Sequence, residues 1–439
     1  MIEILQGHCL DLLGQMRDES VHCIVTSPPY WGLRDYGLKA VAWPTGWKGC
    51  HGLEPTVDLY VQHEVLIFRE ARRVLREDGT LWLNLGDTYS GGGLGGGGSF
   101  ACDGIRMAQE PGTNKNVPGR LGARLVGNGI KTKELVGVPW RVAFALQADG
   151  WFLRCDNVWH KPNPMPESVR DRSTRCHEFV FHFSKSKRYF YDLEAVKEAS
   201  SPNAHARSSS ASQFPSESLR DRNRRRLPGV NPKALKLPGR NSRFHQDRDP
   251  NHSTARKVKQ NESFSAAVVG LVSKRNMRSV WTVATAPYRG AHFATFPPKL
   301  IERCILAGTS ERGCCAGCGA SFARVVAKGK PDLAHQRACG GDLNGHYNGK
   351  ATKDYAGARA QNASDVKARI LAGMVESVTV GWKRGCNCGE EAGEKRCVVL
   401  DPFGGSGTVG EVCNRLGRDA ILLELNGEYI KLANARCGL

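Results

Sequence analysis

Short apolar runs alternate with helical segments at both ends of this chain, and this rhythm constrains the fold more than any other feature. The β-branched run VHCIVT at residues 21–26 stops at a double proline, which is typical of a buried strand that delivers a loop. Apolar spacing predicts a helix over 57–76, a turn at Asp78-Gly79 and a second buried strand over 80–85. A strand, a helix and a strand in succession predict a mostly parallel sheet that helices cover.

The same rhythm continues through the rest of the chain. We expect a strand over 2–5, helix 138–148, strands 152–159 and 177–183, helix 297–307, strand 398–400, helix 408–417, strand 420–424 and helix 427–436. The glycine run 91–98 would cost too much conformational entropy in a regular element, so a linker is favoured over a ligand contact there.

Basic residues outnumber acidic ones, with 62 Lys+Arg against 43 Asp+Glu and a net charge of +19. Seventeen of the basic residues fall between residues 200 and 280, where five acids oppose them. A protein this positive usually binds a polyanion, nucleic acid first, and a merely basic enzyme is the alternative. We expect the basic segment to be flexible alone and to order on its polyanion.

The sequence shows no signal peptide and no apolar stretch that approaches eighteen residues, which predicts a protein outside the membrane. Sixteen cysteines are present, several of them scattered through apolar runs. That usage favours a reduced, cytoplasmic protein over a disulfide framework.

A glycine loop near the C-terminal end lies between a predicted strand and a predicted helix, where glycines let the backbone approach a ligand closely. It fits neither the P-loop pattern nor Gly-x-Gly-x-x-Gly. Glu424 ends the next strand, where an acid accepts hydrogen bonds from ribose hydroxyls in nucleoside-binding folds. The loop and the acid favour an adenosine-containing cofactor, and a tight turn with an incidental Glu is the alternative. The loop residues are Asp401, Pro402, Phe403, Gly404, Gly405, Ser406, Gly407 and Thr408.

A tetrad, Ser27-Pro28-Pro29-Tyr30, directly follows the strand at 21–26. Two prolines fix the backbone and leave carbonyls free to accept hydrogen bonds. Serine offers another acceptor, and tyrosine can stack on a planar ring. These groups suit an exocyclic amine on a base, although a proline-stiffened turn with a packed tyrosine would have the same residues.

The tetrad and the Asp-Pro-Phe-Gly-Gly-Ser-Gly-Thr loop together resemble the DNA amino-methyltransferases that act on cytosine N4 or adenine N6. Further stretches are similar to that family: Phe68 to Leu75, Gly79 to Asp87, Trp159 to Asn163, Pro166 to Val169, Arg172 to Thr174, His177-Glu178 and Phe293 to Pro297. The tetrad precedes the cofactor loop by about 370 residues, which is the circularly permuted, beta-type order. The resemblance covers about 1–200 and 278–439.

The resemblance implies an α/β fold with a Rossmann-like sheet for S-adenosylmethionine, circularly permuted and carrying a basic insert and a small zinc-ribbon-like insert. It implies that a nucleotide flips out of double-stranded DNA, that Tyr30 stacks on it, and that Ser27 and the Pro28 carbonyl accept its amino hydrogens. The residues implied to bind the cofactor are Phe296, the loop residues Asp401, Pro402, Phe403, Gly404, Gly405, Ser406, Gly407 and Thr408, and Glu424.

Serine at the start of the tetrad favours cytosine N4 as the target. In enzymes that methylate adenine N6, Asp or Asn is commoner at this position. One departure concerns the N-terminus, where many relatives carry Gly-Asp and the acid touches the cofactor's adenine. This chain has Gly7-His8, so Asp11 or a backbone group replaces that contact, or the contact is absent.

Two cysteine pairs predict a structural zinc site. Cys315 and Cys318 form C-x-x-C, and Cys386 and Cys388 form C-x-C. Each pair can supply half of a tetrahedral site, and four thiolates leave no open position for catalysis. Structural thiols without a metal are the alternative. Replacement or spare ligands are Cys314, Cys339 and Cys397.

The predicted organisation is a catalytic half over 1–200, a basic target-recognition insert over 201–277, a cofactor-side helix segment over 278–312, a zinc-knuckle insert over 313–396 and a cofactor-binding half over 397–439. The insert would recognise a sequence or act as a non-specific phosphate-binding tether. The predicted setting is a bacterial or phage-infected cell, with a cognate restriction endonuclease as a candidate partner and the oligomeric state open. Methylation of RNA or protein, and a catalytically inactive DNA-binding zinc protein, are the remaining alternatives.

Overall fold

The computed structural model describes residues 1–33, 35–90, 129–199, 274–286, 295–328 and 377–439. The chain divides into two compact units. The first comprises Met1–Lys197, Asn276–Val326 and Thr379–Leu439, and the second comprises Glu198–Arg275 and Ala327–Val378. The glycine run 91–98 and residues 200–273 of the basic segment lie outside the described residues.

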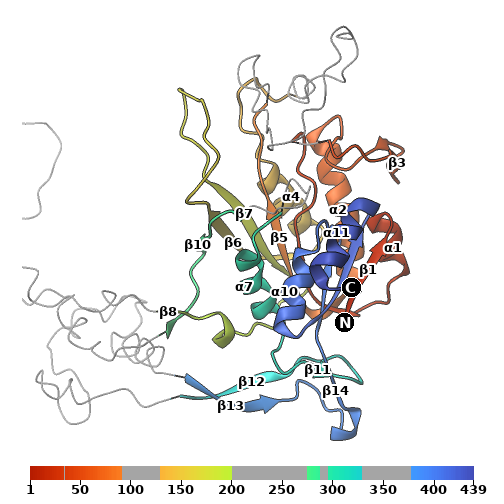
Figure 1. Ribbon diagram of the computed structural model, residues 1–439, viewed down its shortest axis with the longest axis vertical. Helices are drawn as coiled ribbons and strands as arrows, with labels where there is room; N and C mark the ends of the chain where they lie inside the picture. The colour runs from red at the N-terminus through yellow and green to blue at the C-terminus, as the bar shows by residue number, and fades with distance from the viewer. Residues whose placement is uncertain (34, 91–128, 200–273, 287–294, 329–376) are drawn as a thin grey trace, which may run out of the picture. The chain divides into compact units, whose positions relative to one another are not determined.

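Eight strands form the central sheet of the first unit (Figure 1). Strand β7 runs antiparallel to β5 and β6, and every other described pair in this sheet is parallel. The prediction of a mostly parallel sheet is therefore confirmed, and the antiparallel strand β7 makes the sheet a mixed one. Its strand order is β1 (Ile2–Gln6), β16 (Asp419–Glu424), β15 (Val398–Asp401), β2 (Val21–Thr26), β5 (Leu75–Leu85), β7 (His177–Ser184), β6 (Phe152–His160) and β10 (Val280–Thr282).

Helices pack on both faces of this sheet. Three of them contribute to one hydrophobic cluster: α1 (Cys9–Gln15), α2 (Val57–Val74) and α4 (Val138–Ala148). Three others contribute to a second cluster: α7 (Pro298–Gly308), α10 (Thr408–Leu416) and α11 (Gly427–Cys437). Local sequence sets their starts, because Thr56 accepts a hydrogen bond from Leu59 N to cap α2 and Pro298 occupies the first turn of α7.

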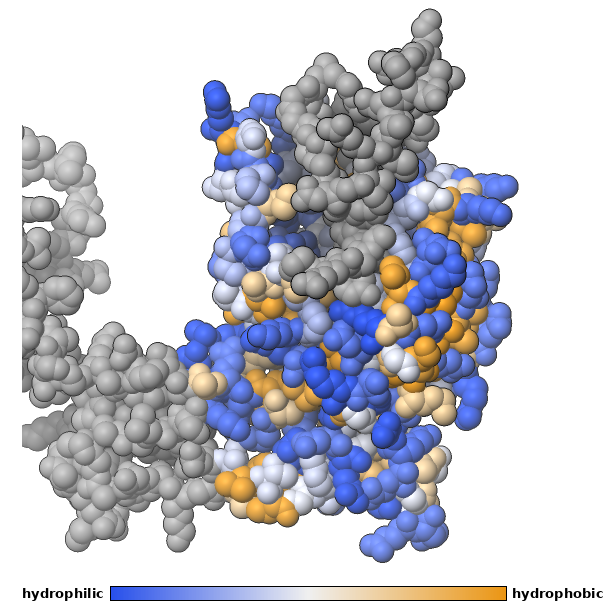
Figure 2. Space-filling model, in the orientation of Figure 1, coloured by the Kyte–Doolittle hydropathy of each residue, from blue (hydrophilic) through white to orange (hydrophobic). Residues whose placement is uncertain are grey.

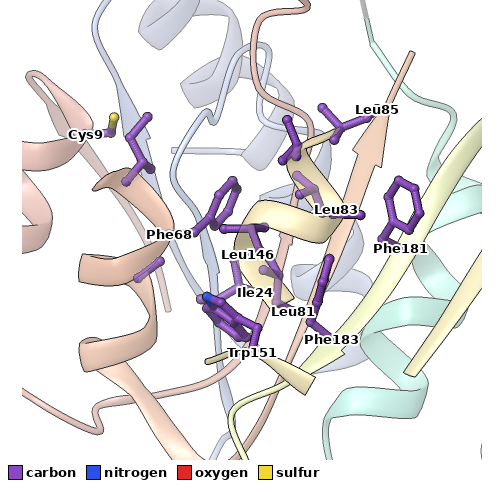
Figure 3. Packing of buried hydrophobic residues seen from close by; sticks show 14 of the residues in the cluster. Cys9, Ile24, Phe68, Leu81, Leu83, Leu85, Leu146, Trp151, Phe181 and Phe183 are labelled. Carbon is purple, nitrogen blue, oxygen red and sulfur yellow. The ribbon is translucent and has the colours of Figure 1, made fainter. Parts of the chain in front are cut away.

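Strand β2 contributes side chains to both clusters because all six of its residues are buried. Ile24 packs in the first cluster, and Cys23 and Val25 pack in the second, as the two-residue period of a strand requires. Figure 3 shows Ile24 with Phe68 and Leu146 in the first cluster. The continuous apolar run at 21–26 is therefore a central strand that both helical layers cover.

The predicted turn at Asp78-Gly79 is wrong. Helix α2 ends at Val74, and β5 runs from Leu75 to Leu85 with an irregularity in which Val21 pairs with Leu75 but Cys23 pairs with Thr80. The Asp78 and Gly79 carbonyls accept hydrogen bonds from the backbone amides of Phe190 and Lys185. These distant partners hold the segment in an extended, bulged conformation where local sequence favoured a turn.

Short paired segments complete the described structure. They are β3 (Val41–Ala42) with β4 (Lys48–Gly49), β8 (Glu198–Ala199) with β9 (Lys274–Arg275), β11 (Cys314–Cys315) with β14 (Glu394–Lys395), and β12 (Ala323–Lys328) with β13 (Ser377–Lys383). Two 3-10 turns are η1 (Glu194–Val196) and η4 (Glu390–Ala392).

Within the described ranges, no helix has the length and apolar character needed to cross a membrane. The face shown in Figure 2 mixes hydrophilic areas with smaller hydrophobic ones.

Candidate functional site

The tetrad and the glycine loop meet at one edge of the sheet. Strands β2 and β15 are parallel neighbours, with Cys23 opposite Val399 and Ile24 opposite Leu400. Their carboxyl ends therefore lie side by side and deliver the tetrad and the loop to the same edge. The Thr26 hydroxyl donates a hydrogen bond to Asp401 Oδ1 at 2.6 Å, which joins the two segments directly.

Tyr30 is held by polar groups from two other strands and from its own tetrad. Its hydroxyl donates to Glu178 Oε2 at 2.9 Å, lies 3.2 Å from Asn84 Oδ1, and accepts a hydrogen bond from Ser27 Oγ at 3.3 Å. Glu178 in turn pairs with Lys161. Burial and the Glu178 charge hold the pKa of Tyr30 well above its usual value, so the side chain remains a neutral phenol. This network fixes the position of the Tyr30 hydroxyl.

The two proline carbonyls of the tetrad differ in their partners. Tyr60 of α2 donates its hydroxyl proton to the Pro29 carbonyl at 3.0 Å. In the part of the chain that the structure describes, no group donates a hydrogen bond to the Pro28 carbonyl. Ser27 donates its own proton to Tyr30, so its oxygen keeps lone pairs that can accept. Ser27 and Pro28 thus offer two acceptors at the end of β2.

Glycine is required where the loop enters α10. Gly407 has φ +79°, and a Cβ on it would lie 2.9 Å from the backbone Cα of Ala433. Its amide donates to the Gly404 carbonyl at 2.9 Å, which closes a tight turn. Arg436 of α11 donates to the hydroxyls of Ser406 and Thr408 at 3.0 and 2.8 Å, so those two side chains are tied to the fold.

Glu424 lies at the end of β16 and receives a backbone hydrogen bond on each carboxylate oxygen. Gly405 N donates to Oε2 at 2.8 Å, and Asn426 N donates to Oε1 at 2.7 Å. Burial raises the pKa of Glu424. Each oxygen can accept a further hydrogen bond, so the carboxylate brings an acceptor pair to the glycine loop.

Other predicted cofactor residues lie in varied surroundings. Pro402 is buried and Phe403 is partly exposed. Phe296 packs in the second hydrophobic cluster. At the N-terminus, His8 packs edge-on against Trp43 with ring centroids 4.9 Å apart, and Asp11 is exposed on α1.

Asp401 is fully buried at the start of the loop. Its Oδ1 accepts hydrogen bonds from Thr26 and from Phe403 N, the latter at 3.0 Å. Burial is the dominant cause that raises the pKa of Asp401 to about 7, against the hydrogen bonds that lower it.

Asp401→Asn should flatten the dependence of stability on pH. With a pKa of about 7 in the folded state, Asp401 should stay protonated up to that pH, whereas in the unfolded chain it should lose its proton near its ordinary pKa of 3.8. The free energy of unfolding should therefore fall by about 1.4 kcal/mol per pH unit between these two pKa values. The variant keeps an acceptor oxygen for Thr26 but has no carboxyl group to titrate, so its stability should not change with pH for this reason. Urea denaturation of both proteins at pH 5, 6, 7 and 8 measures the difference, and parallel curves would contradict the assignment.

The four predicted cysteine ligands come together. One sulfur from each of Cys315, Cys318, Cys386 and Cys388 lies within 4.8 Å of the other three. A tetrahedral zinc site with bonds of about 2.3 Å requires sulfurs roughly 3.8 Å apart, so the cluster has a suitable size. Gly319 follows the first pair with φ +75° and donates its amide to the Cys315 carbonyl at 2.8 Å.

The spare cysteines have a different environment. Cys314 and Cys397 lie near His22 in a second cluster. Both ring nitrogens of His22 are already used, because Nδ1 accepts from Val398 N at 3.0 Å and Nε2 lies 2.8 Å from the Gly319 carbonyl. Arg76 of the β5 bulge also donates to the Cys318 carbonyl at 2.8 Å. The segment 315–319, called the cysteine loop below, is therefore attached to the starts of β2 and β15 through His22 and to the β5 bulge through Arg76. Cys339 lies outside the described residues.

Sequence patterns singled out the tetrad and the loop but not their supports. Tyr60, Arg436 and Thr26 carry no motif, and each acts through a residue remote in sequence. Asn84 and Glu178 stood inside stretches of family resemblance without an assigned role, and strand pairing between β5 and β7 brings both to Tyr30.

Comparisons with known proteins agree on one family. Residues 21–316 and 391–435 match a family model of N6/N4 type described as DNA methylase. The type II methyltransferase M.Cfr9I of Citrobacter freundii is 33% identical over 430 residues, which cover 98% of this chain and 85% of that protein. The type II methyltransferase M.SmaI of Serratia marcescens is 31% identical over 435 residues, which cover 99% and 90%. A solved PvuII DNA methyltransferase (cytosine-N4-specific) has a TM-score of 0.44 and 14% identity over 99% of this chain and 85% of that one, too slight a likeness to carry an argument.

Proposed function

Since the chain belongs to the N6/N4 DNA methylase family, we propose that it transfers a methyl group from S-adenosylmethionine to the N4 amine of cytosine in double-stranded DNA. The observation that carries the proposal is the junction of β2 and β15. The tetrad and the glycine loop leave adjacent parallel strands, and the Thr26–Asp401 hydrogen bond joins them. An amine acceptor site and a nucleoside-type loop at one sheet edge are what direct transfer between two bound molecules requires.

The residues at this edge suit S-adenosylmethionine, which would supply a methyl group on an electrophilic sulfonium. Glu424 offers both carboxylate oxygens to ribose hydroxyls. Phe403 is a partly exposed ring at the start of the loop, and Gly404 to Thr408 form the tight turn before α10. The relatives are type II methyltransferases, and a methyltransferase requires a methyl donor.

The tetrad would bind the target cytosine after it flips out of the duplex. Tyr30 stacks on the ring, with its hydroxyl held by Glu178. Ser27 Oγ and the Pro28 carbonyl accept the two hydrogens of the N4 amine, which directs the nitrogen lone pair toward the methyl group. The rate enhancement then comes from positioning and from acceptors aimed at the positive charge that develops on nitrogen.

The choice of cytosine rests on Ser27 at the first position of the tetrad, and adenine N6 is the second candidate. The beta-type, circularly permuted order, dsDNA recognition by residues 201–277 and a cognate restriction endonuclease are parts of the same proposal.

DNA from cells that express the protein should contain N4-methylcytosine. Nucleosides from a complete digest are separated and identified by mass spectrometry, and long-read sequencing of the same DNA locates the modified motif. A strain that carries the empty expression vector is the control for host methylation. N6-methyladenine without N4-methylcytosine would replace the cytosine assignment, and absence of both would contradict methyl transfer to amines.

We also propose that the four clustered cysteines bind one structural zinc ion. Their thiolates complete a tetrahedral set, so the metal would hold the cysteine loop to the starts of β2 and β15 and take no part in the chemistry.

A further inference from the structure

A buried group of charged and aromatic side chains adjoins Pro29 of the tetrad. His51 is its centre: Nδ1 is 2.9 Å from Glu54 Oε1, and Nε2 is 2.8 Å from Glu64 Oε1. Carboxylates accept hydrogen bonds, so both ring nitrogens of His51 donate and the ring is an imidazolium. Burial opposes this charge, but the two glutamates raise the pKa of His51 to about 10. Two hydrogen bonds on opposite sides of the ring fix its orientation.

The His51 ring contacts one side chain of the glycine loop and one side chain that supports the tetrad. It is stacked with Tyr60 at a centroid distance of 5.0 Å and an angle of 11°. It is also stacked with Phe403 of the glycine loop at 5.7 Å and 15°. The Tyr60 hydroxyl binds the Pro29 carbonyl. A continuous set of contacts thus runs from the glycine loop through His51 and Tyr60 to the tetrad.

The backbone around His51 supports the same connection. Gly52 has φ +89°, and a Cβ there would lie 3.1 Å from Pro29 Cβ. Gly32 N donates to the Gly52 carbonyl at 2.9 Å, and Trp31 Nε1 donates to the Glu54 carbonyl at 2.9 Å. Residues 51–54 are therefore fixed to the tetrad side, while the His51 ring reaches the glycine loop.

A metal ion is the alternative explanation of this group, because His51, Glu54 and His63 each offer a ligand atom within 4.8 Å of the others. The His51 and His63 Nδ1 atoms lie 2.9 and 2.8 Å from the same Glu54 oxygen, which are distances of direct hydrogen bonds. Tetrahedral ligands of one zinc with bonds of about 2.0–2.1 Å lie roughly 3.3 Å apart. The distances favour a hydrogen-bonded group.

We propose that His51 is a positioning residue that couples the glycine loop to the tetrad. A bound cofactor then strengthens binding of the target DNA, and bound DNA strengthens binding of the cofactor. This inference rests on the proposed function, since it assigns the two loops to those ligands. Its physical basis is that Phe403 cannot shift without moving a ring that is locked by Glu54 and Glu64 and packed on Tyr60. Coupling of this kind is reciprocal, so it can be measured from the cofactor side.

The experiment measures the Kd of S-adenosylhomocysteine with and without duplex DNA that contains the methylated motif. The ratio of the two Kd values is the coupling factor. We expect a wild-type factor of at least about five and a His51→Gln factor close to one, because the ring that joins the loops is lost. Thr45→Val is the matched control: it removes the 2.9 Å contact to His63 in the same buried group without touching the connection. Its coupling factor should equal that of the wild type.

A second variant keeps the inference testable if His51→Gln does not fold. Tyr60→Phe retains the stacked ring but loses the hydrogen bond to Pro29. It should leave the Kd of S-adenosylhomocysteine alone unchanged and lower the coupling factor. A wild-type factor of one, or a factor unchanged in either folded variant, overturns the inference. Failure of the wild-type protein to bind S-adenosylhomocysteine at all would instead contradict the proposed function.

Discussion

Tyr30→Ala should lower kcat/KM for methyl transfer about a hundredfold, because stacking of an aromatic ring on an extruded base contributes roughly 1–3 kcal/mol. The variant should still fold. When the phenol is removed, Glu178 keeps its pairing with Lys161 and the hydrogen bond from Asn84 Nδ2 at 3.3 Å, so no buried charge is stranded. Initial rates with tritiated S-adenosylmethionine over a range of DNA concentrations measure the effect.

Tyr30→Phe is the matched variant, since it keeps the ring and removes only the hydroxyl. Its rate should fall a fewfold, in line with the loss of the hydroxyl's hydrogen bonds with Glu178 and Ser27. The Kd of S-adenosylhomocysteine should be the same in both variants and in the wild type. If Tyr30→Phe lost as much activity as Tyr30→Ala, the hydroxyl network and not stacking would be the contribution of Tyr30.

Loss of the proposed zinc ion should strongly destabilise the segments that carry its four cysteine ligands. Protein purified without added zinc should contain about one equivalent, and Cys318→Ser should contain none. Three ligands hold zinc far less tightly than four, and free energy of metal binding is free energy of folding for such a loop. Amide hydrogens of 314–319 and 384–396 should then exchange much faster, and the thermal midpoint should fall. Metal analysis and hydrogen exchange by mass spectrometry measure these changes.

Cys176→Ser provides the comparison for general effects of losing a thiol, because Cys176 is partly buried and lies outside the cysteine cluster. It should keep the metal and the exchange pattern of the wild type. A metal content that is unchanged in Cys318→Ser, or zero in the wild type, would rule out the proposed site.

Local sequence predicted the regular elements of the first unit well. Apolar runs and helix boundaries are properties of neighbouring residues, so β2, α2, β15 and α10 follow the predicted ranges closely. The β5 bulge was missed because Asp78-Gly79 has the composition of a turn, and its extended conformation depends on Lys185 and Phe190, more than a hundred residues away. The antiparallel direction of β7 has no local signal for the same reason.

The candidate site divides in a similar way. Motifs predicted the segments that would carry the chemistry, and strand order brings them together as parallel neighbours. The supports of those segments come from topology: Glu178 reaches Tyr30 across the β5–β7 pairing, and Arg436 reaches Ser406 from the last helix. Side chains such as His51 form no recognisable sequence pattern, because their charge and orientation depend on which carboxylates the fold places around them. The roles of the tetrad, the loop and residues 201–277, and the proposed segment boundaries, stay predictions.

The pairing of β2 with β15 also delays completion of the central sheet during translation, because the two strands are far apart in the sequence. The ribosome completes β2 at Thr26, but its neighbour β15 begins only at Val398, and β1 likewise pairs with the much later strand β16. At about 5–20 residues per second, β2 waits roughly 20 to 75 s for that neighbour. Throughout this interval the nascent chain exposes an apolar strand edge, which makes it a client for chaperones.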